Sequence, residues 1–149
     1  MKKHLITFFD KIILFLLGFS GIFYGCMKYG MPSANFEING VVTNKETSRP
    51  IKHIQITLPT MYGEKNDTLY TNSRGEYNLK FYTNVEFNST EHHFHLKLED
   101  IDSEENGGEF ENKEIDVVFT DKNRIKRGKG RYDLGTFAKT QNIDLETKK

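Results

Sequence analysis

Residues 70–81 read YTNSRGEYNLKF, in which a turn sequence separates two short segments. The turn is expected at residues 72–75, because Asn, Ser, Arg and Gly follow one another and Gly75 can adopt the positive φ that such turns often need. The strand before it is expected at Thr68–Thr71. After the turn, apolar residues alternate with polar ones as far as Phe81. A period of two places apolar side chains on one face, so the segment predicts two strands joined by a tight turn.

The same alternation recurs in short runs from Phe36 onward, and no stretch there keeps helical spacing for long. Pro59 ends one run, because proline lacks the N–H that a strand ladder needs. The other runs place these residues on one face: Phe36, Ile38, Gly40 and Val42; Ile54, Ile56 and Leu58; Phe94, Leu96 and Leu98; Ile115, Val117 and Phe119; Tyr132 and Leu134; Ile143 and Leu145. In a single sheet, about seven such strands would leave one apolar face exposed to solvent. We therefore expect an all-β sandwich of two packed sheets.

The length of 149 residues favours one domain, and 21 basic and 21 acidic residues give a formal net charge of +0. Residues 1–25 hold Lys2, Lys3 and Lys11 against Asp10, which leaves a net charge of −2 on the remainder. A nearly neutral body does not attract a polyanion over a long range, so no nucleic-acid partner is expected. The single cysteine excludes an intrachain disulfide and a site built from several thiolates.

That cysteine, Cys26, directly follows an apolar leader. Residues 1–25 begin with lysines, continue with an apolar run from Ile12 to Phe23 and end with the small Gly25, the pattern of a secretory signal. The run is shorter than the about 20 apolar residues that a membrane span needs. The leader resembles a bacterial lipoprotein signal, which implies cleavage before Cys26 and a diacylglyceryl group on its sulfur. Plain cleavage, an uncleaved anchor and a buried helix of the domain are the alternatives.

On this interpretation the chain has three parts: a signal helix over 1–25, a tether over 26–35 and a β-sandwich domain over 36–149. Acyl chains contribute about 0.8 kcal/mol per buried CH₂, so more than one chain on Cys26 would hold the domain stably at a membrane. The lipid bilayer is therefore the first expected partner.

Two segments of the body resemble a known structural family. Gly40–Val42 with Arg49–Ile56 is similar to the first strand, polar turn, Pro-Ile step and second strand of carboxypeptidase regulatory-like domains. Tyr70–Leu79 is similar to the hairpin of the same domains, with Asn72 where Asp is usual. The resemblance implies a transthyretin-like sandwich and implies no activity.

A second resemblance extends along most of the chain. Tyr29–Ala34, just after the cysteine, and Asp100–Gly108 are similar to segments of radical-SAM-associated lipoproteins of Gram-negative envelopes. This resemblance implies an exported domain that is anchored by lipid in the cell envelope, with the outer membrane as the expected location. It also implies a radical-SAM maturation enzyme or another envelope protein as a partner, without indicating which residue such an enzyme would modify.

The acidic run from Asp100 to Gly108 is a candidate cation site. Its carboxylates Asp100, Asp102 and Glu104, followed by glycines, are the kind of oxygen ligands that calcium prefers. The glycines fall later than in an EF-hand loop, and no helices are expected on either side. A solvated loop between two strands is the leading interpretation, and calcium binding and partner docking are the alternatives.

Three histidines, His92, His93 and His95, lie close together in the sequence. Histidines at positions i and i+2 of a strand project from one face and can ligate zinc. Here Phe94 and the two leucines that follow it occupy the inward face. His93 and His95 are therefore expected to point to solvent, with no further ligand nearby in sequence.

Cationic residues crowd the segment from Arg124 to Arg131, which also contains two glycines. Lysine and arginine commonly protect a sheet edge or occupy a hairpin tip, and this is the expected role. On a tethered domain, the alternative is contact between these cations and anionic lipid headgroups.

Sequence motifs for catalysis are absent, since the chain has no G-x-S-x-G elbow, P-loop, dinucleotide fingerprint or H-E-x-x-H pair. No serine or histidine has a sequence context that predicts a nucleophile with its base. We therefore expect a non-catalytic binding or interaction module without a cofactor. A calcium-stabilised structural domain and an enzyme of unknown type are the alternatives.

Overall fold

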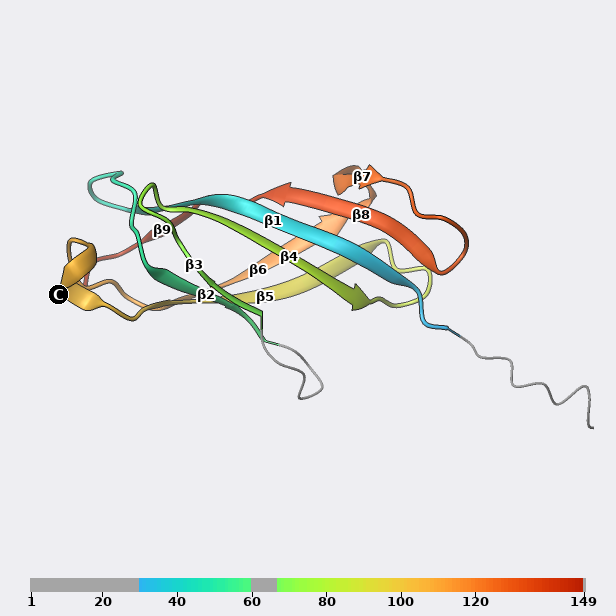
Figure 1. The fold of residues 1–149 in the computed structure, drawn as a ribbon, viewed down its shortest axis with the longest axis horizontal. Coiled ribbons are helices and arrows are strands. Elements are labelled where there is room, and N and C mark those ends of the chain that lie inside the picture. The colour runs from blue at the N-terminus through green and yellow to red at the C-terminus, as the bar shows by residue number, and fades with distance from the viewer. Residues whose placement is uncertain (1–29, 60–66, 149) are drawn as a thin grey trace, which may run out of the picture. The chain divides into compact units, whose positions relative to one another are not determined.

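The computed structural model describes residues 30–59 and 67–148, and the strands within these ranges form a sandwich of two sheets (Figure 1). The five-stranded sheet has the order β4-β1-β8-β7, with β9 also paired to β1, and the four-stranded sheet has the order β3-β2-β5-β6. The all-β sandwich predicted from the sequence is confirmed. Its elements are β1 (Ser33–Asn44), β2 (Ile54–Leu58), β3 (Asp67–Tyr70), β4 (Glu76–Asn84), β5 (Glu91–Asp100), η1 (Ser103–Asn106), β6 (Lys113–Thr120), η2 (Asp121–Asn123), β7 (Arg124–Lys126), β8 (Asp133–Thr140) and β9 (Ile143–Leu145).

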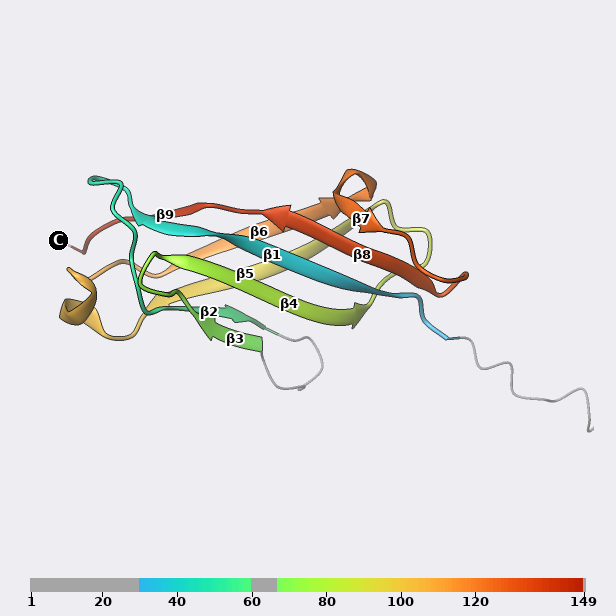
Figure 2. The ribbon, with the colours of Figure 1, turned by 45° about the horizontal axis from the view of Figure 1, so that its top comes forward.

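The turn predicted at residues 72–75 is present. Asn72 Oδ1 accepts hydrogen bonds from the backbone N–H groups of Arg74, at 2.8 Å, and Glu76, at 3.0 Å, and Gly75 has φ = +69°. The two strands that it joins do not form a hairpin, because β3 pairs with β2 in one sheet and β4 pairs with β1 in the other. The turn therefore carries the chain from one layer of the sandwich to the next (Figure 2).

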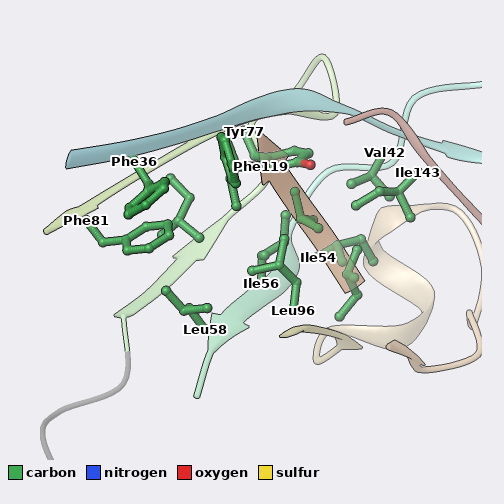
Figure 3. Close-up of a cluster of buried hydrophobic side chains, with 14 of the residues drawn as sticks. Phe36, Val42, Ile54, Ile56, Leu58, Tyr77, Phe81, Leu96, Phe119 and Ile143 are labelled. Carbon is green, nitrogen blue, oxygen red and sulfur yellow. The ribbon is translucent and has the colours of Figure 1, made fainter. Parts of the chain in front are cut away.

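The core lies between the sheets, and Phe36 of β1 is at the centre of an aromatic cluster. Its ring stacks on the rings of Phe81 and Phe137, with centroids 5.5 and 5.3 Å away, and meets those of Phe94 and Phe119 edge-on at 4.6 and 5.1 Å. Such pairs add about 0.5–1.5 kcal/mol each beyond the burial of apolar area. Figure 3 shows Phe36, Phe81 and Phe119 beside aliphatic residues of the four-stranded sheet.

Most of the faces predicted from alternation are buried as expected. The buried members of those faces are Phe36, Ile38, Val42, Ile54, Ile56, Leu58, Tyr77, Leu79, Phe81, Leu96, Leu98, Val117, Phe119, Ile143 and Leu145. Phe94 and Ile115 are partly buried and pack against this core.

One predicted face has the wrong phase. In β8 the buried core residue is Phe137, whereas Tyr132 is exposed and Leu134 is only partly buried. The pairing of β8 with β1 shifts by one residue around Gly135, which has φ = +96°. The extra residue of this bulge shifts the alternation by one position, so the face predicted from Tyr132 and Leu134 is not the face that carries Phe137.

The sandwich begins earlier than the sequence indicated. β1 starts at Ser33, inside the segment 26–35 expected as a tether, and the side chains of Ser33 and Ala34 are buried. The expected signal helix over 1–25 and Cys26 lie outside the described residues. Among the described residues, no helix has the length and apolarity to cross a membrane.

Candidate functional site

An open depression of about 610 Å³ lies beside β1 and β4, and we call it the β1–β4 groove. Its volume is within the range of about 300–1,000 Å³ that is typical of small-ligand sites. The residues that line it come from β1, β3, β4, the turn before β4 and the end of β8: Asn39, Gly40, Val41, Leu69, Tyr70, Asn72, Glu76, Tyr77, Asn78, Thr140 and Asn142.

A close approach between β1 and the segment that follows β8 positions residues on both sides of Gln141 that line the groove. A Cβ atom on Gly40 would lie 2.0 Å from the carbonyl oxygen of Gln141, so only glycine allows the two backbones to pack here. The same oxygen accepts a hydrogen bond from the Tyr77 hydroxyl at 2.6 Å. Burial raises the pKa of Tyr77, so its phenol remains a protonated donor. These contacts hold Gln141 and Asn142 across β1.

Carboxamide groups are frequent among the lining residues of the groove. Asn39 Oδ1 accepts a hydrogen bond from Thr140 at 2.8 Å, and Asn142 Oδ1 accepts one from the Val41 N–H at 3.1 Å. The Nδ2 groups of Asn39 and Asn142 make no hydrogen bond to another described residue, so both can donate to a ligand. Tyr70 adds a ring that is 51% exposed. The groove therefore offers fixed donors beside an aromatic surface.

The negatively charged side chain among the lining residues of the groove is Glu76. A hydrogen bond from the Asn72 side chain, followed by one from Arg74, lowers the pKa of Glu76, so this carboxylate is ionised at neutral pH. Among its described lining residues, the groove has no histidine, cysteine, serine or lysine. This lining suits hydrogen bonding and stacking with a polar ligand, and it lacks a nucleophile paired with a base.

The groove was not predicted from the sequence, because its walls come from segments about a hundred residues apart that only the topology brings together. The available signal was Gly40, a glycine within an otherwise apolar strand face, which often marks a close backbone approach.

Asp100, the last residue of β5, accepts hydrogen bonds from the acidic loop that follows it. Asp100 Oδ1 accepts hydrogen bonds from the Ser103 N–H at 3.2 Å and the Asn106 side chain at 2.9 Å, and Oδ2 accepts one from the Phe110 N–H at 2.9 Å. These donors occupy both carboxylate oxygens. Asp100 therefore closes the loop onto β5.

Asp102 has a different neighbour from Asp100. Asp102 Oδ2 lies 2.8 Å from His53 Nδ1, whereas Asp102 Oδ1 and Asn106 Oδ1 are buried without a hydrogen-bond partner among the described residues. The side chain of Glu104 is outside the described part of the chain. Nowhere in residues 30–59 and 67–148 are three or more His, Cys, Asp or Glu side chains arranged to hold a metal ion. Calcium binding stays a prediction.

The three histidines divide between two faces of β5. His93 and His95 point to solvent as predicted, and His95 lies between Asp116, at 2.9 Å, and Glu114, at 3.2 Å. The hydrogen bond to Asp116, with that to Glu114, raises the pKa of His95. His92 is instead buried against the core, and burial lowers its pKa.

The basic segment forms the edge strand β7 and the connection from β7 to β8, which confirms the prediction of a protected edge or hairpin tip. Arg124 is partly buried, with its guanidinium 5.0 Å from the centre of the Phe137 ring and 2.7 Å from Asp121. The cations after it, from Lys126 to Arg131, are exposed.

The fold and groove define an all-β sandwich with a polar surface groove. No family model matches the chain, and no curated protein matches it. Among solved structures, the chain is similar to the dioxygenase domain of a dioxygenase carbohydrate-binding protein fusion from the cellulolytic bacterium Streptomyces sp. SirexAA-E. The identity is 13%, the TM-score is 0.40, and the match covers 79% of this chain and 84% of that chain. A likeness at this level carries no information about activity.

Proposed function

We propose that the chain is a non-catalytic lipoprotein of the cell envelope, in which the leader 1–25 is removed and acylated Cys26 anchors the sandwich to a lipid bilayer. The observation that carries this proposal is the position of the only cysteine. Cys26 stands between an apolar leader and a sandwich whose first buried strand starts at Ser33. The chain between Cys26 and β1 is too short for a further domain, so acylation would place the sandwich directly at the membrane.

The test is metabolic labelling with a fatty acid in the native host. Wild-type protein is expected to incorporate the label, and Cys26→Ala is expected to lose it, because the thiol is the acceptor of the diacylglyceryl group. Lys28→Ala, two residues further along, is the matched control and should label normally. Equal labelling of Cys26→Ala and the wild type would overturn the proposal.

The sandwich would then act as the binding or interaction module. The β1–β4 groove supports this role, because its free carboxamide donors and exposed Tyr70 suit a polar ligand with hydrogen-bond acceptors, such as a glycan. Chemical-shift titration with a panel of neutral oligosaccharides should perturb residues of the groove. Tyr70→Ala should weaken the response, and His93→Ala, on the outer face of β5, should leave it unchanged. Perturbation confined to other surfaces would exclude the groove as the binding site.

We further propose a Gram-negative outer membrane as the location and a radical-SAM maturation enzyme or another envelope protein as the partner. The support is the resemblance of Tyr29–Ala34 and Asp100–Gly108 to radical-SAM-associated lipoproteins. If the chain is a substrate of such an enzyme, a peptide of the mature protein will differ in mass from its sequence. Fractionation of host membranes will test the location.

The second candidate function is a calcium-stabilised structural domain. It is favoured by the buried oxygens Asp102 Oδ1 and Asn106 Oδ1, for which the described part of the chain offers no hydrogen-bond partner. A ligand that binds only the folded state raises its stability, so millimolar calcium should raise the Tm. Asp102→Asn should remove that increase. An unchanged Tm would retire this candidate.

A further inference from the structure

Three segments meet at the end of the sandwich where the described chain enters β1. The Val85 N–H, in the connection from β4 to β5, donates a hydrogen bond to the carbonyl oxygen of Pro32 at 2.8 Å, and the Ser33 N–H donates one to the carbonyl oxygen of Tyr132 at 2.9 Å. Figures 1 and 2 both show the connections β4–β5 and β7–β8 beside the start of β1, with the C-terminus at the opposite end. We call this the basic end.

Cationic side chains cover the basic end. Lys126, Arg127, Lys129 and Arg131 are exposed, and no described carboxylate lies within ion-pairing distance of them. The nearby Asp133 is occupied by the backbone, because its oxygens accept hydrogen bonds from the N–H groups of Lys129, at 2.8 Å, and Gly135, at 2.9 Å. Glu86, in the β4–β5 connection, and Glu91, at the start of β5, are further exposed acids, and Asp121 pairs with Arg124. The four cations therefore outnumber the three acids around them that remain, Glu86, Glu91 and Asp133.

Exposed aromatic rings accompany these cations. The rings of Phe87, which is 46% exposed, and Tyr132, which is 41% exposed, lie 6.1 Å apart, and the Arg131 guanidinium lies 5.2 Å from the Phe87 ring centre. Met31, at the entry to β1, is 61% exposed. Aromatic rings beside lysine and arginine are typical of surfaces that sit in the headgroup layer of a membrane, because their apolar parts and charged ends suit the two sides of that layer.

The anchor would hold this end, and no other, close to the bilayer. Pro32 is six positions after Cys26, and at about 3.3 Å per position this stretch reaches about 20 Å at full extension. Because the anchor already holds the chain at the membrane, contact between the sandwich and the lipid headgroups becomes intramolecular. A weak attraction is then enough to keep the sandwich on the headgroups. The opposite end, which we call the acidic end, carries Asp100, Asp102 and other acids, which an anionic surface repels.

We propose that the basic end docks on the anionic phospholipid headgroups of the bilayer that holds Cys26, which fixes the orientation of the sandwich and leaves the acidic end directed away from the membrane. This inference rests on the proposed acylation of Cys26. The surface that does the docking is nevertheless formed only by described residues, so it can be tested separately.

The experiment uses the acylated protein from its host, with the acyl group verified by intact mass, in vesicles of phosphatidylcholine with or without phosphatidylglycerol. Amide hydrogen exchange of residues 127–132 should slow at least about fivefold when phosphatidylglycerol is present, the factor that about one cation contributes at an anionic surface. Exchange of residues 105–109 at the other end should stay the same. At about 1 M salt, where the Debye length is about 3 Å, the slowing should disappear.

Charge variants complete the test. Changing Lys126, Arg127, Lys129 and Arg131 to glutamine should abolish the slowing. Lys45→Gln with Lys148→Gln, at the other end of the sandwich, is the matched control and should retain it.

The inference would be overturned if residues 127–132 exchanged at the same rate on neutral and anionic vesicles. If that common rate were slow, it would indicate contact between copies of the chain. A missing acyl group would instead refute the anchor. Unacylated protein coupled to a maleimide lipid through the Cys26 thiol would then test the basic end separately, because the coupling restores the tether.

Discussion

The two ends of the sandwich both carry runs of charge, but the fold uses the two runs differently. At the acidic end, Asp100 accepts three hydrogen bonds from its own loop and Asp102 faces His53. At the basic end, the four cations at the end of β7 and in the β7–β8 connection point to solvent. A run of charge is therefore structural where nearby N–H groups occupy it, and available to a partner where they do not.

Side-chain length explains part of this difference. An aspartate is short and acceptor-only, so it can close a turn by accepting backbone N–H groups, as Asp100 does. Lysine and arginine carry their charge on long stems that extend from the surface into water. The same chemistry recurs at the basic end, where Asp133 accepts the N–H groups of Lys129 and Gly135 and the cations around it remain free.

The largest effect is expected from Asp100→Ala. The Phe110 and Ser103 N–H groups and the Asn106 amide would lose their charged acceptor, so the free energy of unfolding should fall by about 2–3 kcal/mol. Urea denaturation measures this change. Glu109→Ala, an exposed residue of the same loop, is the control and should change stability by less than about 0.5 kcal/mol. If the two variants matched, Asp100 would not be the structural residue of the acidic end.

A smaller, pH-dependent effect is expected from His92, which is the second residue of β5, near the basic end, and packs against Phe36 and Phe137. Burial lowers its pKa below the ordinary value of 6.5, so the unfolded chain takes up the proton first as the pH falls. The contribution of His92 to stability should therefore be complete above pH 6.5 and decrease as the pH falls below it. His95, with a raised pKa, contributes in the opposite direction.

The measurement for His92 is urea denaturation across this pH range in a His95→Gln background. His92→Leu should reduce the loss of stability toward acid. A steeper loss in this variant than in its parent would contradict the assignment of His92 as the buried neutral histidine.

The smallest effect on stability is expected at the basic end. Replacing Lys126, Arg127, Lys129 and Arg131 by glutamine should leave the free energy of unfolding within about 0.5 kcal/mol, because these side chains are exposed and unpaired among the described residues. The same replacement should abolish docking on anionic vesicles. A loss of stability comparable to that of Asp100→Ala would show that the two ends use charge alike.

Local chemistry made much of the fold predictable. The turn at residues 72–75 and the buried faces of β2, β4 and β9 follow from turn residues and alternation, which depend on near neighbours in sequence. The phase of β8 did not follow, because a bulge at Gly135 interrupts the alternation. Nor did the sequence reveal that β3 and β4 belong to different sheets.

The candidate sites were less predictable for the same reason. The β1–β4 groove depends on Gly40 and Gln141 packing together across about a hundred residues. The structural role of Asp100 depends on donors that only the folded loop presents. The basic segment was recognised in the sequence, but its place beside the entry to β1 is a consequence of the topology.

The most direct test of the central claim is intact mass spectrometry of the mature protein from its native host. We expect a polypeptide that begins at Cys26 and is heavier than its sequence by the mass of a diacylglyceryl group, with any further acyl chain. A polypeptide that retains Met1 and carries an unmodified thiol at Cys26 would contradict the account.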